Sequence, residues 1–321
     1  MLLFATLPGA SYSDVCLFCG ISVPSFYCII WRTINAINKA INISFPSTVQ
    51  ECAVLAAGFE NISRHGVIKN CVGAVDGYLL AIATPWKSHA KNIRSYSSGH
   101  YQKYGINIQA SCNAHCCFTF LGIGGPGVTK DRNGIKESSL FNKVENLLPT
   151  GYVCIADCAY QPTENLAPIF GGDLALRKDN DNFIFFASQL RIRIEMAFGI
   201  MTRKWGILQH PLTSSLFSMK HIICCIGRLH NFCIEERLKN ATANVTFNTN
   251  DSLSFNQLAY MHVAAQTENQ EIMSNEYPQW SLAQEAANLA KQSQLIAVAQ
   301  HLGKNEILET SLASFSSTSN D

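Results

Sequence analysis

Apolar residues recur at helical spacing through residues 1–66, so this part of the chain is predicted to be helical. A short helix over 10–20 is followed, after a glycine, by a longer helix that Ser22 caps. The longer helix carries one apolar stripe, made of Phe26, Ile30, Ile34, Ile37 and Ile41. A capping-box pattern opens a third predicted helix over 48–58.

Helix, tight turn and capped helix together have the outline of a helix-turn-helix, a common DNA-reading unit. The outward face of the second helix offers only a few groups for that task, namely Arg32, Asn35, Asn38 and Lys39. A purely structural pair of helices explains the same pattern equally well. The residues alone leave both interpretations open.

From Cys71 onward the pattern becomes extended. Residues 71–77 predict a buried strand that ends on Asp76, and residues 152–156 predict another that runs straight into Asp157. Further strands are predicted at 78–83, 104–110 and 117–122, the first of them pairing back as a hairpin. Helices are predicted at 136–148 and 187–205, and the second has a stripe of Leu190, Ile194, Phe198, Met201 and Trp205 with Glu195 beside it.

The chain is therefore expected to have three parts: a helix-turn-helix-like segment at 1–66, an α/β domain (α+β, mixed sheet) at 67–238, and a tail at 239–321. The tail is rich in Asn, Thr, Ser and Gln, and one helix is predicted in it near 281–302. Residues 67–234 hold 17 Lys and Arg against 10 Asp and Glu, a net charge of +7. A basic central domain fits a polyanionic partner.

The 13 cysteines are scattered, and several lie within apolar runs, which is typical of free thiols in a reducing compartment. Cys16-x-x-Cys19 has no second pair at zinc-finger distance, so a zinc-binding regulator is the weaker alternative. No run of 18 uncharged apolar residues and no basic leader is present, so no membrane segment or signal peptide is predicted.

Two aspartates that end predicted strands and one helical glutamate are the candidate chemistry. Asp76, Asp157 and Glu195 could converge at one edge of a mixed sheet, where clustered carboxylates call for a hard divalent cation such as Mg²⁺ or Mn²⁺. Two such ions can activate water and stabilise a leaving oxygen at a phosphodiester. The alternative for Asp76 is an ordinary strand-end aspartate that accepts hydrogen bonds from the following turn.

A loop that interleaves cations with aromatic residues is the candidate DNA contact. Cations track phosphates and aromatic rings stack on unpaired bases. The residues proposed for this role are Lys87, Lys91, Arg94, Tyr96, Tyr101 and Lys103. Arg191 joins them as a DNA contact or, alternatively, is an ordinary i,i+4 partner of Glu195. The alternative for the whole loop is a solvated surface segment.

Six segments carry a family resemblance: GAVDGYLLAI, SGHYQKYGINIQASC, GPGVTKDRNGIKESSLF, IADCAY, SQLRIRIEMAFGIMTRKWGIL and RLHNFC. With them, residues 10–238 resemble the DDE endonuclease domain of PIF/Harbinger-type transposases and of the nucleases derived from them. The resemblance implies an RNase H-like core and places the catalytic, metal-binding triad on Asp76, Asp157 and Glu195. It also implies Mg²⁺ or Mn²⁺, and cleavage and strand joining at transposon ends.

The same resemblance implies double-stranded DNA partners (terminal inverted repeats and target), a Myb/SANT-like partner protein, a homo-oligomer, and residence in the nucleus, with the cytoplasm as a second location. Asn113 stands where family members often have an aspartate, and Asp131 keeps the acid of a Pro-Gly-x-x-x-Asp loop. Asp131 is either a secondary acid that assists metal or DNA positioning, or a cap of the helix that follows. The chain is expected to begin inside the helical domain. The alternative function is a domesticated or decayed DNA-binding or interaction protein without cleavage activity.

Overall fold

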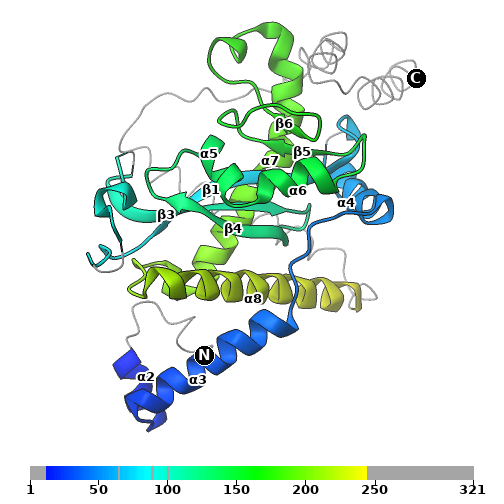
Figure 1. The fold of residues 1–321 in the computed structure, drawn as a ribbon. Coiled ribbons are helices and arrows are strands. Elements are labelled where there is room, and N and C mark those ends of the chain that lie inside the picture. Colours follow the sequence, from blue (N-terminus) through cyan, green and yellow to red (C-terminus); the bar gives the residue numbers. More distant parts are fainter. Residues whose placement is uncertain (1–11, 64–65, 88–89, 100, 244–321) are drawn as a thin grey trace.

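A computed structural model describes residues 12–63, 66–87, 90–99 and 101–243 as a mixed sheet with helices on both faces (Figure 1). The helices are α2 (Tyr12–Cys19), α3 (Val23–Ala40), α4 (Val49–Ile62), α5 (Asp131–Glu137), α6 (Leu140–Leu147), α7 (Asp181–Lys204) and α8 (Leu216–Ala243). Single 3₁₀ turns lie at Ile93–Tyr96, Gly172–Leu174, Lys178–Asn180 and Gly206–Leu208. Apart from the end of α8, the predicted tail and its helix at 281–302 lie outside the described residues.

The sheet of the described chain combines an antiparallel and a parallel half. Its strands are β1 (Cys71–Ala81), β2 (Ser97–Ser98), β3 (Lys103–Cys112), β4 (Phe118–Pro126), β5 (Val153–Ala156) and β6 (Leu166–Pro168). β4, β3 and β1 pair antiparallel, and β1, β5 and β6 pair parallel, while the short β2 pairs with the start of β3. The mixed α/β class expected from the sequence is confirmed.

The predicted hairpin between residues 71–77 and 78–83 is wrong, because β1 is one continuous strand of 11 residues. Gly77 does not turn the chain. It pairs with Gln109 inside the ladder, and a Cβ built on it would lie 1.8 Å from Oδ1 of Asp131. A close approach between backbone and side chain is the other common reason for a glycine inside a strand. Asp76 therefore lies in the middle of a strand.

Two helix boundaries also differ from the prediction. Residues 136–148 are not one helix, because they contain the end of α5 and the whole of α6. Ser139 separates the two, and its φ of 69° lies in the left-handed region and breaks the helical path. α7 begins at Asp181 rather than at Ala187, and its whole predicted apolar stripe is buried. The stripe is what fixes this helix on the sheet.

Each face of the sheet has its own apolar cluster. Alternate residues of β1 enter opposite clusters: Cys71, Ala74 and Leu80 pack with residues of α7 and α8, whereas Val72 and Val75 pack with residues of α5 and α6. Figure 1 shows the same division, with α5 and α6 on one side of the sheet and α7 on the other. By this alternation Asp76 falls on the α7 face.

The amino-terminal helices pack on α8. Phe26, Ile30 and Ile34 of α3 are buried in the cluster that contains α7 and α8. The side chain of Asn38 donates to the carbonyl of His221, and that of Arg228 donates to the carbonyl of Ile41. α3 and α8 lie side by side in Figure 1. These contacts favour the structural pair over a free DNA-reading unit.

His230 and Asn231, in the middle of α8, have a structural role. His230 is buried and lies 2.9 Å from the carbonyl of Cys116, while the amide of Asn231 pairs with both backbone groups of Phe118 at 2.7 Å. Asn231 thereby extends the hydrogen bonding of β4. His230 is accordingly a core histidine and not a ligand.

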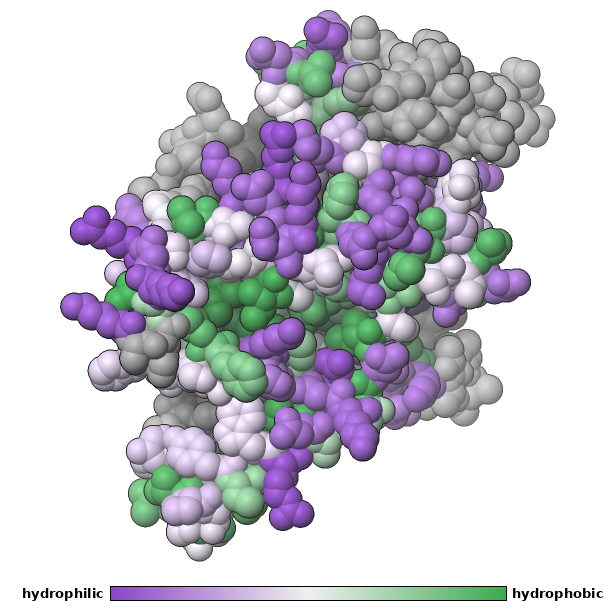
Figure 2. All heavy atoms as spheres, in the orientation of Figure 1, coloured by the Kyte–Doolittle hydropathy of each residue, from purple (hydrophilic) through white to green (hydrophobic). Residues whose placement is uncertain are grey.

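The surface seen in Figure 2 is hydrophilic over α5, α6 and α8, and apolar residues gather in the band over β4 between them. Among the described helices no single one is both long and apolar enough to cross a membrane. The bent pair α2 and α3, at 103° to one another, passes that test only when taken together.

Candidate active site

Asp76 and Asp157 are brought together by the parallel pairing of β1 and β5. Val75 is the register partner of Ala156, so the next residues along the two strands are the two aspartates. Neighbouring strands lie about 4.8 Å apart, and residues at the same level of a parallel pair point to the same face. The strand alternation on β5 directs Asp157, like Asp76, to the α7 face.

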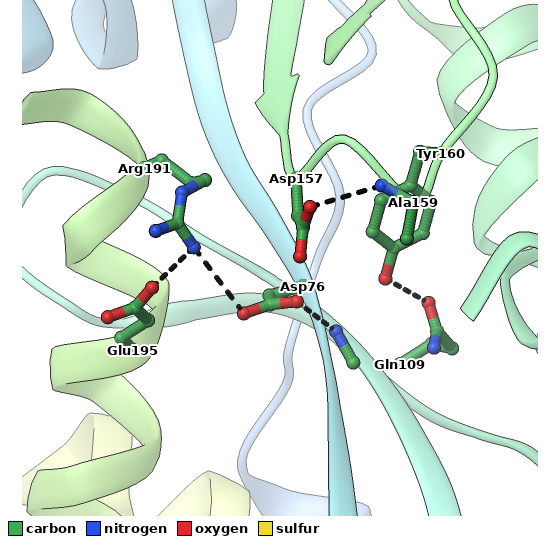
Figure 3. Close-up of polar contacts among 8 residues, drawn as sticks. Asp76, Gln109, Asp157, Ala159, Tyr160, Arg191 and Glu195 are labelled. Atoms are coloured by element: carbon green, nitrogen blue, oxygen red, sulfur yellow. Dashed lines mark hydrogen bonds and ion pairs between the residues drawn. The ribbon is translucent and has the colours of Figure 1, made fainter. Parts of the chain in front are cut away.

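Glu195 reaches the same place from α7, through Arg191. The guanidinium Nη1 of Arg191 contacts Oε1 of Glu195, one helical turn away, and lies 3.9 Å from Oδ2 of Asp76. Figure 3 shows the guanidinium between these two carboxylates, with the side chain of Asp157 above that of Asp76 in this view. The site thus contains one arginine and three acids, from β1, from the turn after β5 and from α7.

The electrostatics of Asp76 reflect this crowding. Burial raises the pKa of its carboxyl to about 7, and Asp157 and Glu195 add to the increase, whereas the Gly77 N–H and Arg191 oppose it. The Gly77 N–H donates to Oδ1 of Asp76 at 2.7 Å. An acid whose ionised form is this poorly compensated gains from any additional positive charge.

Asp157 is fixed by its own turn. Its carboxylate accepts a hydrogen bond from the N–H of Ala159 at 3.1 Å (Figure 3). A hydrogen bond with Asp157 is also the first cause that raises the pKa of the Cys158 thiol to about 11. The turn after β5 therefore orients the carboxylate without any cation in direct contact among the described side chains.

Asp131 lies on the opposite face of the sheet from the three acids. It begins α5, and its Oδ1 accepts hydrogen bonds from the side-chain amides of Asn107 and Gln109, both at 2.9 Å. Gln109 in turn accepts from the hydroxyl of Tyr160 at 2.7 Å. This buried network joins α5, β3 and the turn after β5, and it favours a structural role for Asp131 over that of a secondary acid.

The described side chains of the basic and aromatic loop lie mostly at the surface. Lys87, Lys91, Arg94, Tyr101 and Lys103 are exposed, and Tyr96 is half-buried against the core. After burial, the charges of Asp131 and Asp76 are the causes that raise the pKa of Tyr101, so its hydroxyl lies within electrostatic range of these two aspartates.

The residues present fit a divalent metal ion. All three donors are carboxylate oxygens, the chemistry that Mg²⁺ and Mn²⁺ prefer. Asp76 and Glu195 lie on β1 and α7, and Asp157 directly follows β5. The one cation among them is a guanidinium shared by two of the acids. In the described part of the chain, no three His, Cys, Asp or Glu side chains stand close enough to hold an ion without rearrangement. Asp76, Asp157 and Glu195 would be the ligands.

Comparison with known proteins agrees with this geometry. Residues 75–231 match the family model described as DDE superfamily endonuclease, and the match runs from β1 to α8 and includes all three acids. No curated protein and no solved structure matches the chain. The family match, together with the curled mixed sheet, supports the DDE superfamily, an RNase H-like core and a nuclease-type function on DNA. Nucleases of this superfamily generally use divalent metals.

Sequence reasoning missed two features of the site. Trp86, 76% exposed, directly precedes the basic loop and is a further candidate for stacking on a base. The sequence feature that could have indicated Trp86 is its position between Pro85 and Lys87. The contact of Arg191 with Asp76 joins residues 115 positions apart, and no sequence spacing indicates it.

Proposed function

We propose that the chain is a metal-dependent DNA endonuclease of the PIF/Harbinger transposase type, which cuts phosphodiester bonds at transposon ends and joins the resulting strands. One observation carries this proposal: the parallel register of β1 and β5 sets Asp76 beside Asp157 on the face where Glu195 of α7 arrives. Three carboxylates so placed, in a segment that matches an endonuclease family, fit metal-assisted phosphoryl chemistry best.

Each residue has a defined task in this proposal. Asp76, Asp157 and Glu195 hold the divalent ions, Mg²⁺ or Mn²⁺, which when bound supply an activated water and stabilise the leaving oxygen. β1 and β5 fix the two aspartates through main-chain pairing, and the buried stripe of α7 fixes Glu195. The cations and aromatic rings of the loop at 87–104 orient the DNA backbone beside them.

The remaining parts of the proposal follow from that activity. The substrates are the terminal inverted repeats and target DNA, a Myb/SANT-like protein assists in their recognition, and two or more copies bring two ends together. Because the proposed substrate is chromosomal DNA, we infer that the protein acts in the nucleus. α3 and α8 supply the rigid base on which the sheet rests.

The test is a nicking assay on supercoiled DNA that carries the ends of the element. The parent is expected to nick in Mg²⁺ or Mn²⁺ but not in EDTA, and Asp76→Asn and Glu195→Gln should each lower the rate by orders of magnitude. Glu164→Gln is the matched control, since Glu164 is exposed in the turn between β5 and β6. A parent that bound DNA without ever nicking it would establish the DNA-binding protein without cleavage activity instead.

A further inference from the structure

Arg191 links the helix to the strand at the centre of the acid cluster. Its Nη1 contacts Glu195 on its own helix and lies 3.9 Å from Oδ2 of Asp76 on β1. The side chain is only 20% exposed, and that of Asp76 only 16%. This is more than the surface i,i+4 pair that the spacing alone suggests, because the guanidinium also neutralises a buried carboxylate from another element.

The guanidinium holds this position by charge rather than by a complete set of hydrogen bonds. Its Nε is buried and has no hydrogen-bond partner among the described residues. Both carboxylate contacts pass through one nitrogen, Nη1, rather than through the bidentate fork that makes arginine pairs strong. A competing cation with more charge could therefore replace it.

We propose that Arg191 is the internal counter-cation of the metal-free site, and that its guanidinium must leave Asp76 and Glu195 for a divalent ion to bind there. This inference rests on the proposed function, because it assumes that these carboxylates are metal ligands. Arg191 then competes with the metal ion for these carboxylates, and it stabilises them when no ion is bound. Once displaced, its charge lies beside the ion and is available to a DNA phosphate.

The competition can be measured without DNA and without catalysis. Mn²⁺ binding to the full chain would be followed by electron paramagnetic resonance and by calorimetry for the parent, Arg191→Gln and Arg203→Gln. Arg203 is the matched control, since it is an exposed arginine in the last turn of the same helix. Removing a positive charge a few ångströms from a dication should tighten Mn²⁺ binding by about tenfold or more, and Arg203→Gln should leave it unchanged.

Thermal unfolding in EDTA gives the second readout. Arg191→Gln leaves the acids uncompensated, so its melting temperature in EDTA should lie below that of the parent, and Mn²⁺ should restore more of it than in the parent. If Arg191→Gln did not fold, Arg191→Met, which keeps an apolar stem at this mostly buried position, would be measured with the same expected direction.

The outcomes separate the two proposals. Tighter Mn²⁺ binding by the arginine variant supports the counter-cation. If the parent bound Mn²⁺ and the variant bound it equally or more weakly, Arg191 would not compete, and the metal site would stand without it. If neither protein bound Mn²⁺, and Asp157→Asn cut DNA at the parent's rate, the metal-dependent function itself would be refuted. The inference would be refuted with it.

Discussion

Asp76 on β1 and Asp157 after β5 stand at the same level of the sheet, because Val75 and Ala156 are partners in a parallel ladder. Main-chain pairing therefore brings the backbones at the two aspartates to about one strand spacing from each other. It also explains why a mid-strand aspartate is tolerated: β5 ends beside it, and the space beyond Ala156 is where the acids and Arg191 meet.

The pKa of Asp76 predicts a pH-dependent effect on stability in the absence of metal. The folded-state pKa of about 7 lies above the ordinary 3.8. The contribution of this carboxyl group to the free energy of unfolding is therefore fully present below pH 3.8 and is lost as pH rises through 7. Asp76→Asn cannot ionise. In EDTA, its stability relative to the parent should therefore increase by a few kcal/mol between pH 5 and pH 8, as measured by denaturant unfolding. A difference that stayed constant with pH would contradict the assignment.

The pKa of His230 predicts that the folded protein loses stability as the pH falls, the opposite of the effect of Asp76. Burial lowers the pKa of its imidazole to about 4, and the buried Nδ1 has no partner in the described chain to receive a proton. The stability it contributes is complete above its ordinary pKa of 6.5 and is lost as pH falls towards 4, by about 3 kcal/mol. His230→Gln should remove this part of the acid destabilisation, whereas Gln at the exposed His210 should not. Parallel pH profiles for the parent and His230→Gln would refute it.

Gly77 has a strict size limit. Alanine there would place its Cβ 1.8 Å from Oδ1 of Asp131 and push that carboxylate away from Asn107 and Gln109. The expected loss is about 1–3 kcal/mol in the free energy of unfolding. Gly99→Ala is the control, because a Cβ at Gly99 meets no atom within 4 Å. In an Asp131→Ala background the cost of Gly77→Ala should shrink, and an undiminished cost would mean that Asp131 is not what Gly77 accommodates.

The basic loop predicts a salt effect on DNA binding. Log–log plots of affinity against salt fall with a slope near 0.9 for each phosphate neutralised. Replacing Lys91, Arg94 and Lys103 together with alanine should flatten that slope. Replacing Arg203 and Lys220, exposed cations on α7 and α8, should not. An unchanged slope in the triple variant would show that the loop does not track the backbone.

The strength of local patterns decided what the sequence could predict. The buried stripe of α7, the capping box of α4 and the apolar strand before Asp157 each follow from spacing, and the structure contains all three. The predicted hairpin after Asp76 is wrong because Gly77 does not turn the chain. The side chain of Asp131, 54 positions later, is what requires a glycine there. The bridge from Arg191 to Asp76 was equally out of reach, since a contact between a helix and a strand exists only once both have docked.

The most direct test of the account compares DNA cutting with DNA binding in Asp157→Asn. An amide oxygen is a much weaker ligand for a hard cation than a carboxylate, so cutting in Mg²⁺ should fall by orders of magnitude. Metal-free DNA binding should be equal to the parent's or stronger, because one charge that repels the phosphate is gone. Glu164→Gln should change neither. If Asp157→Asn cut DNA at the rate of an active parent, Asp157 would not be a metal ligand and the assigned triad would be wrong.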